Sequence, residues 1–223
     1  MKDLNGETML SRVVRRAQRA SLAGEVIVAT SKNSVDDVIV KECSRLGVAV
    51  LRGEENDVLD RYCRAARSLN ADAVVRITSD CPLIEPEIVD KVIGAFLQYA
   101  PDYASNTLQR SYPRGLDTEV MTWNALESAW REASSTYQRA HVTPYIYEHP
   151  ECFRLLPVLG QADYSNHRWT VDTQEDLTFV RQIYEGMDSG GNFHWKKLIT
   201  LLEHEPELVK INQGIAQKAL CEG

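Results

Sequence analysis

The stretch Ala-Val-Val-Arg-Ile-Thr-Ser-Asp-Cys-Pro-Leu-Ile-Glu-Pro-Glu, residues 73–87, decides the fold prediction for this chain. It begins with an apolar, β-branched run that predicts a buried strand. The run ends at Asp80-Cys81-Pro82, and Pro86 then stands where the first turn of a helix begins. Asp80 is therefore expected just past the carboxyl end of a strand that leads into a helix.

A carboxylate in this place has two interpretations. Ligands of open α/β sheets bind at the carboxyl ends of the strands, where a carboxylate can hold a metal ion and the phosphates that the metal carries. Aspartate is also a common turn residue, because its side chain accepts hydrogen bonds from nearby backbone. The local pattern around Asp80 leaves both interpretations open.

Strands and helices alternate around this stretch, which predicts an α/β fold of three layers, with a mostly parallel sheet and helices on both faces. No linker or repeat divides residues 1–223, so we expect a single domain. In the first half, strands are predicted at residues 25–30, 48–51 and 73–78, and helices at residues 7–22, 34–46, 57–69 and 85–99. In the second half, strands are predicted at residues 103–106, 119–122, 153–159 and 168–172, and helices at residues 123–132, 137–149, 174–184 and 194–203.

The first predicted helix, residues 7–22, has an apolar face and a basic one. The basic face carries Arg12, Arg15, Arg16 and Arg19, and we expect it to be solvated. A flexible break is predicted at residues 189–192, and a polar tail from residue 206.

Composition limits the classes of protein. Of the 223 residues, 43% are hydrophobic and 26% charged, as in soluble globular proteins. The net charge of −7 and the lack of a basic block argue against duplex nucleic acid as a partner. No apolar run approaches the roughly 20 residues that span a bilayer, and no signal peptide is visible, so we expect no membrane partner and a cytoplasmic location. The histidines and five cysteines show no zinc-ligand spacing, and we expect free thiols.

A second aspartate repeats the pattern of Asp80. Asp172 follows the predicted strand at residues 168–172 and precedes a predicted helix. If the two strands are parallel neighbours, both carboxylates project from one sheet edge, and two carboxylates suit Mg²⁺. Each aspartate is also placed to cap the following helix. Arginines that could grip phosphate or carboxylate by paired hydrogen bonds lie near these ends: Arg76, Arg110, Arg114 and Arg168.

Five ordered motifs, spread over nearly the whole chain, resemble the cytidylyltransferase family. They are Arg-Ile-Thr-Ser-Asp-Cys-Pro-Leu-Ile-Glu-Pro (76–86), Asn-Asp-Val-Leu-Asp-Arg-Tyr (56–62), Tyr-Pro-Arg-Gly-Leu-Asp-Thr-Glu (112–119), His-Val-Thr-Pro-Tyr-Ile-Tyr (141–147) and Arg-Trp-Thr-Val-Asp-Thr-Gln-Glu-Asp-Leu (168–177). The nearest branch is the one named after spore coat polysaccharide biosynthesis protein F, with the CMP-acylneuraminate and CMP-deoxy-octulosonate synthetases as relatives.

The resemblance implies a nucleotide-diphospho-sugar transferase (GT-A-like) fold and an enzyme that joins CMP from CTP to an acidic sugar, releasing pyrophosphate, for surface or spore-coat polysaccharide. It implies Mg²⁺ on Asp80 and Asp172, with Arg114 as a third catalytic residue. It places Thr30, Ser31, Gly53 and Asp57 near the nucleotide base. The remaining substrate-binding residues that we expect are Arg76, Asp117, Glu119, His141 and Arg168.

Two departures from the family pattern stand out. The family opens with a strand and a triphosphate-binding loop of the type Ala-Arg-x-x-Ser-x-Arg-Leu-Pro-Gly-Lys, whereas residues 1–6 resemble the segment after that loop. The expectation is an N-terminally truncated chain that is inactive by itself. The family's Arg-Glu-His-Val is here Arg139-Ala140-His141-Val142, which removes a carboxylate.

Two other functions compete with this one. A glycosyltransferase on the same fold would use a nucleotide-sugar donor and release no pyrophosphate. A non-catalytic remnant would bind no nucleotide and would form a homodimer through residues 107–150, the region that we also expect to hold a dimer contact or a sugar-side insertion. Within it, Tyr137, Tyr145 and Tyr147 suit either a subunit contact or the core.

Overall fold

The computed structural model describes residues 1–187 and 192–217, so all but the last residue of the break expected at residues 189–192 lies outside the described residues. Within these ranges no helix has the length and apolarity needed to cross a membrane. The strands are β1 (Asp3–Leu4), β2 (Glu7–Thr8), β3 (Ile27–Ser31), β4 (Ala49–Gly53), β5 (Ala73–Arg76), β6 (Tyr103–Ser105), β7 (Glu119–Thr122) and β8 (Leu155–Pro157). The helices are α1 (Met9–Ala17), α2 (Asp37–Leu46), α3 (Val58–Ser68), α4 (Pro86–Tyr99), α5 (Trp123–Glu132), α6 (Thr136–His141), α7 (Pro144–Glu148), α8 (Gln174–Gly186), α9 (Trp195–His204), α10 (Pro206–Lys210) and the 3₁₀ helix η1 (Ser34–Asp36).

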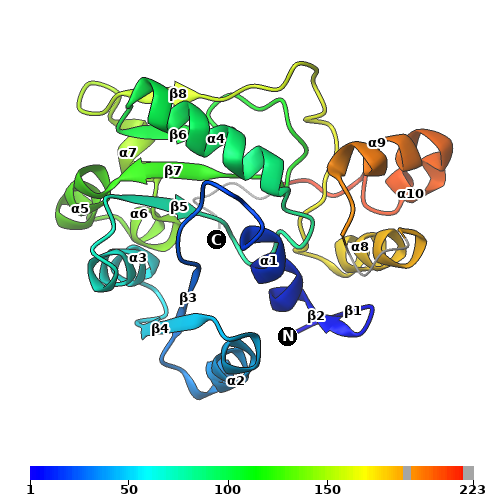
Figure 1. Ribbon diagram of the computed structural model, residues 1–223, viewed down its shortest axis with the longest axis horizontal. Coiled ribbons are helices and arrows are strands. Elements are labelled where there is room, and N and C mark those ends of the chain that lie inside the picture. The colour runs from blue at the N-terminus through cyan, green and yellow to red at the C-terminus, as the bar shows by residue number, and fades with distance from the viewer. Residues whose placement is uncertain (188–191, 218–223) are drawn as a thin grey trace.

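The main sheet has the strand order β5-β7-β6-β8, and β3 and β4 form a separate parallel pair (Figure 1). The α/β class is confirmed, but the main sheet is mixed rather than mostly parallel, because β7 runs antiparallel to both β5 and β6. The cause is the connection at residues 106–118, which contains no helix. A parallel pair needs a crossover connection, usually a helix, and α2 supplies one between β3 and β4.

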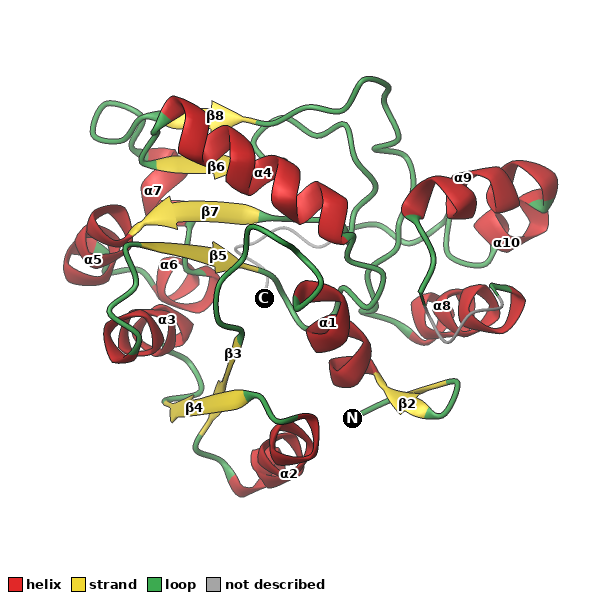
Figure 2. Ribbon diagram, in the orientation of Figure 1, coloured by secondary structure: helices red, strands yellow, loops and turns green. Residues whose placement is uncertain are grey.

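Helices cover both faces of the main sheet, as expected, because successive strand side chains point to opposite faces. One face packs against α1 and α4, which crosses the sheet in Figure 2. The other face packs against α3, α5 and α7. The first face carries Val75, Ala104, Val120 and Leu156, and the second carries Val74, Tyr103, Met121 and Leu155.

A cavity, called the second cavity below, lies between the β3–β4 pair and the main sheet. It measures about 640 Å³ and is lined mainly by apolar side chains of β3, β5, α1 and α3. β3 and β5 are not hydrogen-bonded to each other. Val28 of β3 and Val75 of β5 are therefore only partly buried, although both belong to hydrophobic clusters.

The N-terminal region differs from the expected single helix. Residues 3–8 form a hairpin, and α1 begins at Met9 because the Thr8 side chain caps it by accepting a hydrogen bond from the Ser11 amide at 3.0 Å. The expectation of a solvated basic face was wrong for Arg12 and Arg16, which are 8% and 3% exposed.

Two further elements differ from the sequence prediction. The helix expected at residues 137–149 is divided into α6 and α7, because Val142 adopts a φ of +75° and Thr143 precedes a proline. The polar tail includes the short helix α10. By contrast, Gly47 ends α2 in the left-handed conformation that the sequence predicted.

Candidate active site

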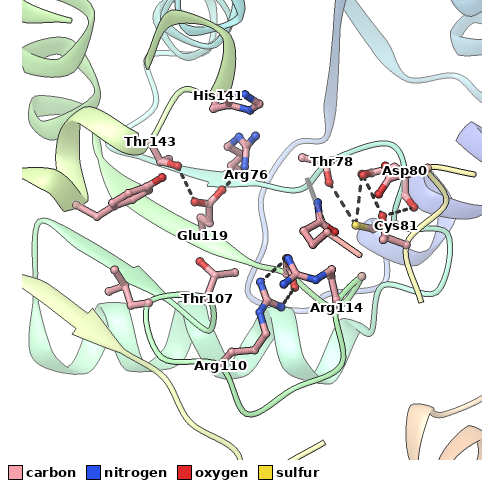
Figure 3. Close-up of a pocket in the computed structure, with 17 residues that line it drawn as sticks. Arg76, Thr78, Asp80, Cys81, Thr107, Arg110, Arg114, Glu119, His141 and Thr143 are labelled. Atoms are coloured by element: carbon pink, nitrogen blue, oxygen red, sulfur yellow. Dashed lines mark hydrogen bonds and ion pairs between the residues drawn. The ribbon is translucent and has the colours of Figure 1, made fainter. Parts of the chain in front are cut away.

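A cavity of about 570 Å³ lies at one end of the main sheet (Figure 3). It collects residues from β5, β7, the loop at residues 106–118, α6 and the segment before α8. Of the residues expected from the sequence, those that line it are Arg76, Asp80, Arg110, Arg114, Asp117, Glu119, His141 and Asp172.

The two aspartates meet through adjacent backbone segments rather than adjacent strands. Residues 168–172 form no strand, and their backbone is bonded to two loops. The Val171 amide donates to the Asp80 carbonyl at 2.9 Å, and the Trp169 amide donates to the Arg114 carbonyl at 2.7 Å. The prediction of parallel neighbouring strands was wrong, yet both carboxylates line the same cavity.

Asp80 has little compensation for its negative charge. Its Oδ2 accepts a hydrogen bond from the Thr170 hydroxyl at 3.0 Å, and its Oδ1 accepts one from the Cys81 thiol at 3.5 Å. Burial and the nearby Asp80 charge raise the pKa of Cys81, so this thiol stays protonated and is a poor nucleophile. Neutral donors of this kind leave the Asp80 carboxylate available to a cation.

The two carboxylates are of the chemical kind that Mg²⁺ prefers as ligands. Within residues 1–187 and 192–217, no cluster of three or more acidic, cysteine or histidine side chains has metal-binding geometry. Mg²⁺ does not need such a cluster, because it is usually held by one or two carboxylates together with substrate phosphates and water. Asp80 and Asp172 supply hard oxygen ligands beside a cavity with room for a substrate.

Glu119 lines the cavity, but its carboxylate is buried and bonded to neighbouring side chains. It stands at the start of β7, is 6% exposed and forms an ion pair with Arg76 of β5, its cross-strand neighbour. Its Oε1 accepts hydrogen bonds from the Tyr103 hydroxyl at 2.5 Å and the Thr143 hydroxyl at 2.7 Å. Burial alone would lower the pKa of Arg76, but the Glu119 carboxylate outweighs it and raises that pKa. Arg76 therefore stays charged.

The loop at residues 106–118 carries a paired and an unpaired arginine. Arg110 is bonded to both carboxylate oxygens of Asp117, at 2.6 and 3.0 Å. Among the residues that the structure describes, the Arg114 guanidinium forms no hydrogen bond or salt bridge. Burial and the neighbouring Arg110 lower the pKa of Arg114 (Figure 3). An anion beside Arg114 would relieve this unfavourable environment.

Five expected residues do not line the cavity. Thr30, Ser31 and Gly53 lie at the ends of β3 and β4, and Thr30 lines the second cavity instead. Asp57 caps α3 and binds Arg139 through both carboxylate oxygens. Arg168 lies behind Asp172 and binds its Oδ2 at 2.6 Å.

The sequence missed other residues of the cavity wall. Thr143 and Thr170 lie within two of the quoted motifs but were given no role there, and Gln217 lies in the expected polar tail. Tyr147 also lines the cavity, although the sequence suggested a core or a subunit contact.

Gly115 allows two backbone segments of this site to approach closely. Its φ is +104°, and a Cβ built on it would lie 2.6 Å from the Trp169 carbonyl carbon and 2.7 Å from the Thr170 nitrogen. Only glycine combines this conformation with so close a backbone approach. The loop that carries Arg114 is thereby held against the segment that ends at Asp172.

Replacing Gly115 by alanine is therefore expected to destabilise the fold by about 1–3 kcal/mol, because the new methyl group collides with backbone atoms. Urea unfolding measures this change. Gly24→Ala is the control, since nothing lies within 4 Å of its Cβ position. Equal unfolding midpoints for the two variants would contradict the close approach.

The fold and the cavity together define a class: an α/β protein with carboxylates at one end of its sheet, beside a guanidinium that has no partner among the described residues. The cytidylyltransferase family model matches residues 1–211. Over 214 residues the chain is 28% identical to spore coat polysaccharide biosynthesis protein SpsF of Bacillus subtilis, which covers 93% of this chain and 88% of that protein. It is also 42% identical over 98 residues to the 3-deoxy-manno-octulosonate cytidylyltransferase of Anaeromyxobacter dehalogenans, covering 43% of this chain and 39% of that enzyme.

A solved structure gives the same answer. A cytidylyltransferase from Leptospira borgpetersenii superposes with a TM-score of 0.89 at 30% identity, covering 97% of this chain and 90% of that one. The chain belongs to the cytidylyltransferase family, and the resemblance drawn from its motifs is confirmed. This family is a class of nucleotidyltransferases that use CTP.

Proposed function

We propose that this protein is a Mg²⁺-dependent enzyme that transfers CMP from CTP to a hydroxyl group of an acidic sugar and releases pyrophosphate. Membership of the family supports the nucleotidyl transfer. The observation that carries the rest is one cavity that holds Asp80, Asp172 and the unpaired Arg114. Such a cavity has room both for a cation that carries phosphates and for a separate anion.

The acidic sugar is proposed from the chemistry of Arg114. A guanidinium binds a carboxylate through two parallel hydrogen bonds, and Arg114 has its donors available in a half-buried place. The partly matching 3-deoxy-manno-octulosonate cytidylyltransferase supports an acidic sugar, and SpsF supports a role in polysaccharide synthesis.

The reaction would be an in-line displacement. The sugar hydroxyl oxygen forms a bond to the α-phosphorus while the bond to the pyrophosphate oxygen breaks, and the hydroxyl proton is released to water. Bound Mg²⁺ would neutralise charge on the phosphate oxygens. The chain's own residues would supply position: Arg114 orients the sugar acid, and the Glu119–Arg76 pair fixes the floor against which it rests.

The test is a pyrophosphate-release assay with CTP, Mg²⁺ and a panel of acidic and neutral sugars. In a version of the protein that carries the family's N-terminal strand and triphosphate-binding loop, we expect release with CTP and an acidic sugar, and none when either is omitted. Release of a nucleoside diphosphate from a nucleotide sugar, with no pyrophosphate, would favour the glycosyltransferase alternative. No release with any nucleotide or sugar would contradict the proposal.

Replacing Arg114 by glutamine is expected to raise the KM for the acidic sugar by about 10- to 100-fold, since a hydrogen bond to a charged group contributes about 1.5–3 kcal/mol. The KM for CTP should change less. Steady-state kinetics measure both constants, with Arg131→Gln, an exposed arginine of α5, as the control. An unchanged KM for the sugar would remove Arg114 from the sugar side.

A further inference from the structure

The C-terminal segment at residues 212–217 touches the candidate site, although it lies beyond the part of the chain that the family model matches. Asn212 is 4% exposed, and Gln217 lines the cavity. Neither belongs to a motif of the sequence. Their role is inferred from the side chains that they contact.

Asn212 binds a buried carboxylate, and both residues contact the arginine that pairs with it. Asp176, in the first turn of α8, is fully buried. Its Oδ1 accepts hydrogen bonds from Arg168 Nε and Asn212 Nδ2, each at 2.9 Å. Its Oδ2 accepts from Arg168 Nη2 at 2.9 Å and from the Asp172 and Thr173 amides at 3.1 Å. Asp176 thus fixes the backbone of Asp172.

Arg168 connects this buried carboxylate to the cavity. Its Nη2 also donates to Asp172 Oδ2 at 2.6 Å, and its Nη1 donates to Gln217 Oε1 at 2.6 Å. Its own carbonyl accepts a second hydrogen bond from Asn212 Nδ2 at 2.9 Å. The side chain of Arg168 is only 10% exposed, so it has little freedom to move.

Asp172 is therefore held at one of its two oxygens. Arg168 binds Oδ2, and among the described residues Oδ1 has no hydrogen-bond partner. The Asp172 side chain is 43% exposed. One carboxylate oxygen is fixed, and the other remains available to a ligand in the cavity.

We propose that Asn212 and Gln217 are positioning residues of the active site, which act through Arg168 and Asp176 to hold Asp172 ready to bind the metal. This inference rests on the proposed function, because it assigns Asp172 to the metal. The inference goes beyond the proposed function because it makes the C-terminal segment part of the site. Partners of metal ligands commonly have this role, and their loss typically weakens metal binding or activity by about 10- to 100-fold.

The test compares Asn212→Ala with Gln213→Ala, its exposed neighbour. The first readout needs no metal or substrate: amide hydrogen exchange of Asp172 and Thr173, followed by NMR. Loss of Asn212 should accelerate it about fivefold or more. The second readout is Mn²⁺ binding in the presence of CTP, followed by electron paramagnetic resonance, which Asn212→Ala should weaken by about 10- to 100-fold. Gln213→Ala should change neither.

Gln217→Ala is a milder variant, because Gln217 is exposed and its loss leaves the Asn212 contacts intact. It should weaken Mn²⁺ binding severalfold and keep the wild-type melting temperature, so it serves if Asn212→Ala does not fold. Amide exchange that does not change in Asn212→Ala would overturn the inference. So would faster exchange with wild-type Mn²⁺ affinity, since Asn212 would then be structural only. Failure of the wild-type protein to bind Mn²⁺ with CTP would instead overturn the proposed function, and the exchange data alone would decide whether the segment holds Asp172.

Discussion

Asp80→Asn is expected to lower the rate of Mg²⁺-dependent pyrophosphate release by a factor of about 10³ or more, in a version of the protein that carries the family's triphosphate-binding loop. A metal ion that neutralises phosphate charge contributes several kcal/mol to catalysis, and each 1.36 kcal/mol is about a factor of ten in rate. Asparagine keeps the size of the side chain and can still accept the Thr170 hydrogen bond. The substitution therefore removes the charge and preserves the packing.

Three measurements test this expectation: the rate of pyrophosphate release, its dependence on Mg²⁺ concentration, and the midpoint of urea unfolding. Asp163→Asn is the control, because Asp163 is exposed and bonded only to the nearby Ser165. Asp172→Asn should lose activity to a similar degree. Normal turnover in either site variant would show that the metal assignment is wrong.

Arg16→Met is expected to destabilise the fold by about 3–5 kcal/mol, because removing one partner of a buried ion pair leaves an uncompensated charge. Arg16 is 3% exposed and donates to the Ile84 carbonyl at 2.5 Å, the Phe193 carbonyl at 3.1 Å and Glu85 Oε2 at 3.2 Å. Glu85 is 4% exposed, and its Oε2 also accepts a hydrogen bond from the Trp195 amide at 2.9 Å. One arginine thus joins α1, the start of α4 and the segment before α9.

The same helix provides the control. Arg15 is 57% exposed and pairs with Glu7 at 3.3 Å, so Arg15→Met should change the free energy of unfolding by less than about 1 kcal/mol. Adding Glu85→Gln to Arg16→Met should restore part of the loss, because the buried charge is then removed. Urea unfolding followed by circular dichroism measures all three. Equal effects of the two arginine substitutions would contradict the buried ion pair.

The local elements of this fold could be predicted because their signals are local. The β-branched run of β5, Pro86 at the start of α4 and Gly47 at the end of α2 all act over a few residues. Burial of Arg16 depends on partners that lie 68, 69 and 177 residues away in the sequence. No periodicity in α1 indicates where those partners fold, so a basic face was taken for a solvated one.

Some residues of the candidate site could likewise be predicted from local sequence, and others could not. The strand and turn that present Asp80 follow from residues 73–87, and Arg114 from a neighbouring motif. The pairing of Glu119 with Arg76 is a cross-strand contact, which the sequence does not specify until β7 is known to lie beside β5. Gln217 reaches the cavity only because the chain returns to it after α10. The pairing of segments distant in the sequence therefore determines which residues reach the site, and local sequence patterns do not reveal it.

The strand order also governs how the protein must be made. β7 inserts between β5 and β6, both of which precede it in the chain, and its Glu119 lies 43 residues beyond the Arg76 that it pairs with. During synthesis β5 and β6 therefore leave the ribosome without their common neighbour. Non-local pairings slow folding, and strand edges that wait for partners are exposed to association with other chains. We expect the yield of folded protein to depend on how quickly residues 119–122 emerge, which makes translation speed over this stretch a determinant of expression.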